Sequence, residues 1–130
     1  MVANELDVQI KDTVFDPDPT GSVKKVMIKE KGGITYYKVF LYLEGEDVSL
    51  VESVTYILHR TFSNPIRTVR RTPSNPNCQL VVWTWGVFTV RVKIIDKRGL
   101  TFQLSHPLTY EDELPSSKEQ YEHDTKAMLA

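Results

Sequence analysis

Apolar and polar residues alternate along most of the chain with a period of two. The clearest stretch follows Trp85, where one face carries apolar side chains and the other polar ones: Phe88, Val90, Val92 and Ile94 against Thr89, Arg91 and Lys93. Such alternation is typical of a half-buried strand. The same pattern predicts further strands or strand pairs over 6–11, 23–29, 36–44, 51–58, 66–71, 83–96 and 100–105.

Turn-forming residues separate these strands, and no long helical period occurs. The turns fall at Asp16–Gly21, Lys31–Gly33, Glu44–Asp47 and Asp96–Gly99. Seven or eight short strands in this arrangement predict an all-β chain, an immunoglobulin-like antiparallel β-sandwich. We expect its core to include Leu41, Leu43, Tyr56, Leu58, Phe88, Val90, Val92 and Ile94.

Three regions are expected along the chain. Residues 1–22 form a strand and turn that belong to the sandwich, residues 23–110 form its main part, and residues 111–130 form a polar tail. In the tail, Ser116 and Glu119 have the spacing of a capping box, and one helical face would hold Tyr121, Thr125 and Met128. A short terminal helix and a frayed tail both fit this pattern.

Composition removes several classes of function. The 130 residues include 16 basic and 17 acidic side chains, a net charge of -1, which gives no overall electrostatic case for nucleic acid or membrane. Cys78 is the single cysteine, so no internal disulfide forms, and no apolar run is long enough to span a membrane. Because no signal-peptide core precedes the first strand, we expect an intracellular protein, cytoplasmic or, in a eukaryote, nuclear.

Catalytic chemistry finds little support in the residues. The three histidines and one cysteine have no metal-ligand spacing, and no phosphate-binding glycine loop occurs. A Cys78–His59 dyad is the weaker interpretation of two loop residues. A group of arginines, at 60, 67, 70 and 71, fits a solvated basic edge better than a phosphate site. We therefore predict no enzymatic activity and no cofactor.

Two tryptophans at the entry to the strand leave two interpretations open. Trp83 and Trp85 flank Thr84, and Gly86 permits a turn there. The indoles are either a binding surface or packing in the core of the sandwich.

The order of three segments favours a binding surface over packing in the core. The chain contains Tyr37–Gly45, then Leu58-His59-Arg60-Thr61-Phe62 followed by Pro65, then Trp85-Gly86-Val87-Phe88, with Leu104–Leu108 near the end. This order resembles the YEATS domain family over roughly residues 23 to 110. The resemblance implies an immunoglobulin-like sandwich that binds acylated lysine through loops at one end.

The resemblance also implies roles for particular residues. The acyl chain would pass between the rings of Phe62 and Trp85, and Thr61 would bond the acyl amide, as would the backbone N–H at Trp85. The slot would be completed by the remaining members of the two loops: His59, Phe88, Thr84 and Gly86. We expect His59, Thr61, Phe62 and Trp85 to converge on one exposed groove.

Several positions depart from the family pattern. Tyr37 and Val39 stand where many members have histidine and tryptophan, and Thr84 replaces the usual glycine, where it would narrow the slot or shift the loop. The arginine group disfavours a basic histone tail. These departures suggest a divergent branch, such as the prokaryotic YEATS-like domains. The partner is then an acylated lysine on a protein or an acyl-bearing small ligand, and a larger complex stays open. The alternative is a sandwich for protein–protein assembly that does not bind acyl-lysine.

Overall fold

The computed structural model describes residues 6–15 and 25–123, and this part of the chain is all-β. It contains nine strands: β1 Gln9–Thr13, β2 Val26–Lys31, β3 Ile34–Glu44, β4 Val51–Ile57, β5 Ile66–Arg70, β6 Leu80–Thr84, β7 Thr89–Asp96, β8 Thr101–Pro107 and β9 Tyr121–His123. Three short 3-10 turns complete it: η1 Val48–Leu50, η2 Tyr110–Glu113 and η3 Lys118–Gln120. The strands form two sheets of the β-sandwich class, which confirms the predicted fold class.

The chain divides into two compact units. The first comprises Met1–Lys11, Tyr42–Leu80 and Phe88–Leu108, and the second comprises Asp12–Leu41, Val81–Val87 and Thr109–Ala130. Strands β1, β3 and β6 contribute residues to both units.

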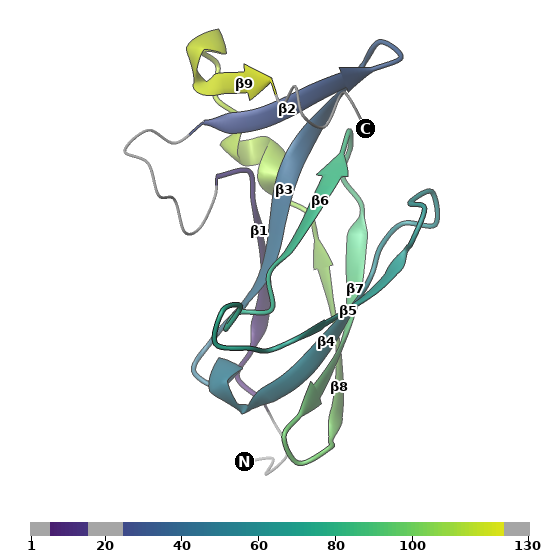
Figure 1. The fold of residues 1–130 in the computed structure, drawn as a ribbon, viewed down its shortest axis with the longest axis vertical. Coiled ribbons are helices and arrows are strands. Elements are labelled where there is room, and N and C mark those ends of the chain that lie inside the picture. Colours follow the sequence, from purple (N-terminus) through teal and green to yellow (C-terminus); the bar gives the residue numbers. More distant parts are fainter. Residues whose placement is uncertain (1–5, 16–24, 124–130) are drawn as a thin grey trace. The chain divides into compact units, whose positions relative to one another are not determined.

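The first unit contains a four-stranded antiparallel sheet in the order β5-β4-β7-β8 (Figure 1). In its centre, Val54 pairs with Ile94 and Tyr56 with Val92, and all four side chains are buried. Directly paired residues share a face, so the alternation of the two strands places their apolar side chains together. Strand β5 is an edge of this sheet; its Arg70 forms an ion pair with Glu52.

Tyr56 joins the sheet to the loop that follows β5. Its hydroxyl donates a hydrogen bond of 2.6 Å to the carbonyl of Cys78, and the side chains of both residues are fully buried. Burial raises the pKa of the Cys78 thiol to about 11, so the thiol is protonated at neutral pH. A protonated, inaccessible thiol is no nucleophile, and the weaker dyad interpretation therefore has no chemical basis.

A close approach of two chain segments ties the turn after β3 to the residues before β1. Asp7 accepts a hydrogen bond from the Asp47 amide at its carbonyl, and its own amide donates to the Asp47 carboxylate at 2.8 Å. Gly45 lies at φ +141°, and a Cβ there would overlap the Asp7 carbonyl. This turn therefore requires glycine at position 45.

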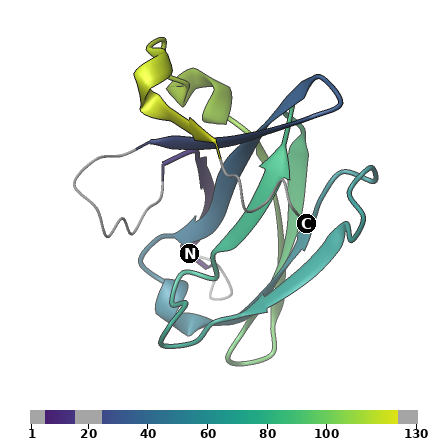
Figure 2. The same ribbon diagram turned by 45° about the horizontal axis from the view of Figure 1, so that its top comes forward.

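In the second unit, β2 and β3 form an antiparallel hairpin and β9 runs parallel to β2 (Figure 2). Ile28 pairs with Tyr37 on the inner face. The other face of β2 carries Lys29, whose ammonium lies 4.5 Å from the centre of the Trp83 ring, a cation–π contact. Trp83, which is partly buried, thus packs against Lys29 on this face of β2.

The terminal region differs from the sequence prediction. After η2, the described part contains the three-residue 3-10 helix η3, in which Ser117 rather than Ser116 accepts the amide of Glu119, and then β9. The described residues up to 123 thus hold a short 3-10 helix and a strand rather than a longer helix over the expected face. Thr125, Met128 and the predicted turn at 16–21 lie outside the described residues.

The predicted core is confirmed with one exception. Seven of its eight side chains are buried, whereas Phe88 is only half-buried because it lies one residue before β7 begins.

Removal of the Tyr56 hydroxyl is expected to destabilise the protein. Tyr56→Phe keeps the ring but leaves the Cys78 carbonyl without this donor, at a cost of about 1–3 kcal/mol in the free energy of unfolding. Urea denaturation at pH 7 measures the change. Thr68→Val, which removes an exposed hydroxyl from β5, serves as a control. Equal denaturation midpoints for wild type and Tyr56→Phe would contradict this role.

The same substitution also changes the pH dependence. Burial raises the pKa of Tyr56, while an unfolded tyrosine ionises near about 10. The contribution is therefore complete below pH ~10 and falls as the pH rises above it, because only the unfolded state then releases the proton. Denaturation between pH 8 and 11 is expected to show a shallower decline for Tyr56→Phe than for wild type.

Candidate functional site

The loop between β4 and β5 carries three of the predicted site residues in the first unit. Two backbone hydrogen bonds close it, from Leu58 to Pro65 at 2.7 Å and from Phe62 to His59 at 3.0 Å. Within it, His59 Nδ1 lies 2.8 Å from the Thr61 hydroxyl and accepts the Thr61 amide at 3.3 Å. The Thr61 hydroxyl is therefore held in place although its side chain is exposed.

Phe88 is the platform on which this loop packs. Its ring centre lies 5.4 Å from that of Phe62 and 6.1 Å from that of His59, with interplanar angles of 57° and 59°. Tilted rings at these distances attract one another through their quadrupoles. The Phe88 carbonyl accepts the amide of Leu108 at 3.0 Å, which fixes the platform to the end of β8. The structure thus brings four predicted site residues together.

The second group of predicted residues lies in the second unit, where β6 ends. Trp85 is 63% exposed and is the only aromatic residue among the large exposed apolar side chains of the described residues. Thr84 is 5% exposed; its hydroxyl donates to the Gly86 carbonyl at 2.9 Å and accepts the Gly86 amide at 3.3 Å. The side chain that replaces the family glycine is therefore turned inward and closes a small turn.

Gly86 was predicted because glycine permits a turn, but the structure gives it a different role. Its φ is not in the left-handed region, so the turn does not need glycine for backbone reasons. A Cβ at this position would meet nothing within 4 Å. Gly86 therefore leaves open space directly after the exposed indole.

One residue of this region was missed by sequence reasoning. Tyr110, in η2, donates its hydroxyl to the Gly86 carbonyl at 3.0 Å. It is 24 residues away in the sequence, within a polar stretch that carries no motif, so no local signal pointed to it.

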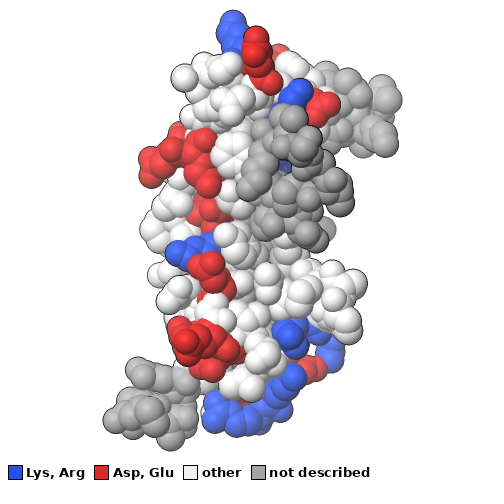
Figure 3. Space-filling model, turned by 90° about the vertical axis from the view of Figure 1, so that its left-hand side faces the viewer, with Lys and Arg blue, Asp and Glu red and all other residues white. Residues whose placement is uncertain are grey.

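The chemistry of these groups is neutral and aromatic. Within the described residues, no three potential ligands gather to hold a metal ion, and no helix is long and apolar enough to cross a membrane. Acidic and basic side chains share the face shown in Figure 3, in keeping with a net charge of -1. Each of the two groups suits an uncharged ligand with a flat apolar part and a group that can hydrogen-bond.

Comparison with known proteins identifies relatives of this chain. A family model described as the prokaryotic YEATS domain matches residues 37–109. The transcription initiation factor TFIID subunit 14 of Schizosaccharomyces pombe is 40% identical over 72 residues, which cover 48% of this chain and 28% of that protein. The chain thus spans less than a third of the length of this relative.

Two solved structures share the fold. One is the Yaf9 YEATS domain recognising an H3K122suc peptide, with 20% identity and a TM-score of 0.53, covering 88% of this chain and 83% of that one. The other is the yeast AF-9 homologue Yaf9, with 18% identity and the same TM-score, covering 85% and 74%. At these identities the likeness concerns the fold.

Loss of the Phe88 ring is expected to loosen the β4–β5 loop. Phe88→Ala removes the platform for His59 and Phe62 and costs about 1–2 kcal/mol, less than a fully buried phenylalanine because the ring is half-exposed. Amide exchange at Phe62 should become several-fold faster, as measured by NMR.

Phe102→Ala is the matched control, since Phe102 is a half-buried phenylalanine of β8 in the same unit. It should lower stability without changing exchange at Phe62. Equal exchange in the two variants would show that Phe88 does not support the loop.

Proposed function

Because the chain belongs to the prokaryotic YEATS domain family, we propose that it is a non-catalytic module that binds acylated lysine. The observation that carries the proposal is a Thr61 hydroxyl fixed by His59 within the aromatic group of Phe62 and Phe88. A fixed hydroxyl beside aromatic rings matches the polar and apolar parts of an acyl amide.

The hydrogen bonds within the loop support a role for Thr61 as an acceptor. His59 Nδ1 accepts the Thr61 amide, so in this tautomer it carries a lone pair and the ring proton is on Nε2. The Thr61 hydroxyl then donates to Nδ1 as well and keeps its own lone pairs free to accept. The N–H of the acylated lysine is the matching donor.

Trp85 supplies the apolar surface for the acyl chain. An indole that is 63% exposed gains most when a ligand covers it, since burial of its area is favourable. Stacking on a flat conjugated chain adds to that gain. An unmodified lysine brings an ammonium whose hydration would be lost, so it is disfavoured.

The relatives agree in kind with this function. The Yaf9 domain recognises a modified histone peptide, and the other relative is a subunit of a transcription initiation factor. For this chain, the ligand class is an acylated lysine on a protein, with an acyl-bearing small molecule as a second source of the same amide. Location in the cytoplasm or nucleus and membership of a larger complex stay predictions.

A second candidate function is protein–protein assembly. Trp85 and its neighbour Val87 are 63% and 50% exposed, and large exposed apolar side chains are frequent anchors of interfaces. In that case the two side chains would be covered by a partner whether or not it is acylated.

Affinity for three peptides separates these functions. We expect crotonyl-lysine to bind several-fold more tightly than acetyl-lysine, because stacking contributes about 0.5–1.5 kcal/mol beyond area burial. Unmodified lysine should bind weakest. Calorimetry with three peptides of identical sequence measures the order.

Two variants identify the groups responsible. Thr61→Val keeps the shape but leaves the amide without its acceptor, a loss of about 1–3 kcal/mol in binding, while Thr68→Val on β5 should change nothing. Trp85→Ala should abolish the preference for crotonyl-lysine. Equal affinity for all three peptides, or binding indifferent to Trp85→Ala, would support the assembly function instead.

A further inference from the structure

Two buried hydroxyl groups converge on one backbone carbonyl beside the exposed indole. The Gly86 carbonyl accepts the Thr84 hydroxyl at 2.9 Å and the Tyr110 hydroxyl at 3.0 Å. A carbonyl oxygen has two lone pairs, so both are occupied. One donor belongs to the same turn and the other to η2, in the same unit.

Without these bonds the turn would have little to restrain it. Glycine populates more backbone conformations than any other residue, and the space around Gly86 is open. A trans peptide is planar, so a fixed Gly86 carbonyl also fixes the direction of the following N–H at Val87. The two hydroxyls therefore limit the conformations in which the chain leaves Trp85.

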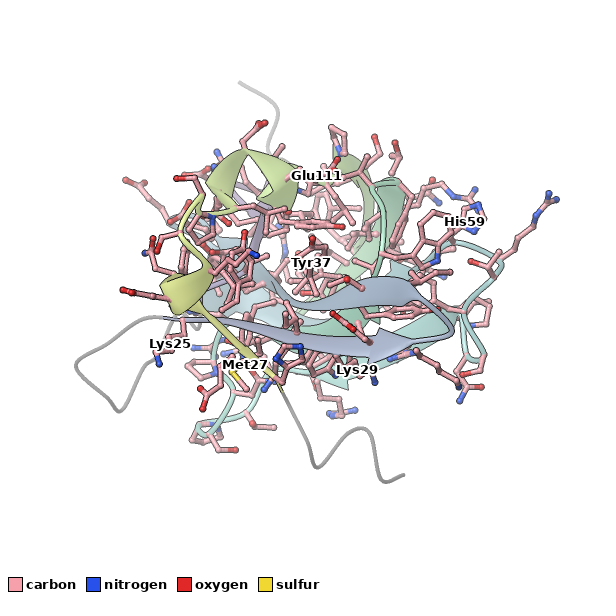
Figure 4. The ribbon with its side chains drawn as sticks, turned by 90° about the horizontal axis from the view of Figure 1, so that it is seen from above. Lys25, Met27, Lys29, Tyr37, His59 and Glu111 are labelled. Atoms are coloured by element: carbon pink, nitrogen blue, oxygen red, sulfur yellow. The ribbon has the colours of Figure 1, made fainter. Side chains whose placement is uncertain are left out.

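Tyr110 is itself held firmly. Its ring is fully buried, and its centre lies 5.9 Å from that of Tyr37, which points from β3 toward η2 (Figure 4). In the same view, Met27 and Lys29 lie on the side of β2 that faces away from Tyr37. Burial raises the pKa of Tyr110 to about 12, so its hydroxyl remains a donor at neutral and moderately alkaline pH.

Carboxylates fix both ends of η2 to the end of β1. The Asp12 carboxylate accepts the Thr109 amide at 2.9 Å and the Thr109 hydroxyl at 3.1 Å. The Glu113 carboxylate accepts the Val14 amide at 3.0 Å and the Thr13 hydroxyl at 3.1 Å. Hydrogen bonds to a carboxylate are stronger than those between neutral groups, so the position of Tyr110 is set before any ligand arrives.

We propose that Tyr110 is a positioning residue. Its hydrogen bond to the Gly86 carbonyl orients the turn of residues 84–87, the Trp85 turn, for ligand binding. The effect on binding rests on the proposed function. A turn that is already ordered loses less conformational entropy when the ligand binds, which strengthens binding without a direct contact. Tyr110 follows directly after the segment that the family model matches, and its carboxylate anchors also lie outside that segment.

Tyr110→Phe tests the inference, because it removes the hydroxyl and keeps the ring. Tyr121→Phe is the matched control: Tyr121 lies in the same unit and donates its hydroxyl to the Pro115 carbonyl at 2.6 Å, with no bond to the Trp85 turn. Each variant loses one hydrogen bond that a tyrosine hydroxyl donates to a backbone carbonyl. A comparison of their melting temperatures therefore separates a general loss of stability from a specific effect on the Trp85 turn.

The first measurement needs no ligand. With 5-fluorotryptophan in both indole positions, the fluorine resonance of Trp85 is assigned by its absence in Trp85→Phe. Tyr110→Phe should shift or broaden this resonance and speed amide exchange at Gly86 by about two- to tenfold, the range expected for one net hydrogen bond. Tyr121→Phe should leave both unchanged. If the Trp85 resonance and the Gly86 exchange rate change no more in Tyr110→Phe than in Tyr121→Phe, the inference is overturned.

The second measurement is affinity for the crotonyl-lysine peptide. Tyr110→Phe should weaken binding about three- to tenfold relative to Tyr121→Phe, and equal affinities would overturn the positioning role in binding. If wild type binds no acylated peptide, the proposed function fails, and the resonance of Trp85 still decides whether Tyr110 orients the turn.

A double variant tests the shared carbonyl directly. Thr84→Val and Tyr110→Phe each leave one hydroxyl on the Gly86 carbonyl. Because Thr84→Val also removes the acceptor of the Gly86 amide, exchange is measured at the Val87 amide, which belongs to the same peptide unit as that carbonyl. Each variant alone should speed this exchange moderately. Together they should speed it by more than the product of the two single effects. A purely multiplicative result would mean that the two hydroxyls act independently and would overturn their joint restraint of the turn.

Discussion

The pairing of β4 with β7 determines where the candidate site residues of the first unit lie. The last pair in this register joins Ile57 to Arg91, and an antiparallel ladder continued by two residues brings His59 to the neighbourhood of Phe88. The ring contacts of the β4–β5 loop are therefore a result of the strand register. A slip of one residue would turn the buried side chains of one of the two strands outward, so the hydrophobic core holds the site in place.

Much of this arrangement was visible in the sequence. The strand periodicity predicted β4 and β7 because each alternates buried residues with less buried ones; the second face is partly buried in β4 and mostly exposed in β7. The loop motifs identified His59, Phe62 and Phe88, which the structure brings together. Phe88 continues the alternation of β7 but lies one residue before the strand begins, so periodicity alone placed it in the core. Its position outside the strand is what leaves its ring available to the loop.

The features that sequence reasoning missed depend on contacts between distant segments. Strand β9 has three residues and pairs in parallel with β2, so neither its length nor its pattern distinguishes it from a turn. The contribution of Tyr110 depends on carboxylates almost one hundred residues away, at Asp12, and on the opposite end of η2, at Glu113. Such partners follow from the topology of the sheet, which a local pattern does not specify. The capping-box spacing in the tail marked only the three-residue 3-10 helix η3, with Ser117 rather than Ser116 as its cap, because the chain continues directly into β9.

The exposed edge at β5 has a consequence for the behaviour of the protein in concentrated solution. Within the described residues no strand pairs with its outer side, so its backbone groups are available to another chain. Two copies joined through this edge would bring the guanidinium groups of Arg67 and Arg70 from both chains close to one another. Like charges across paired strands repel, and edge strands that carry them resist further sheet growth. Arg67 and Arg70 are thus edge residues of the kind that opposes growth into extended β-sheets, independent of any ligand.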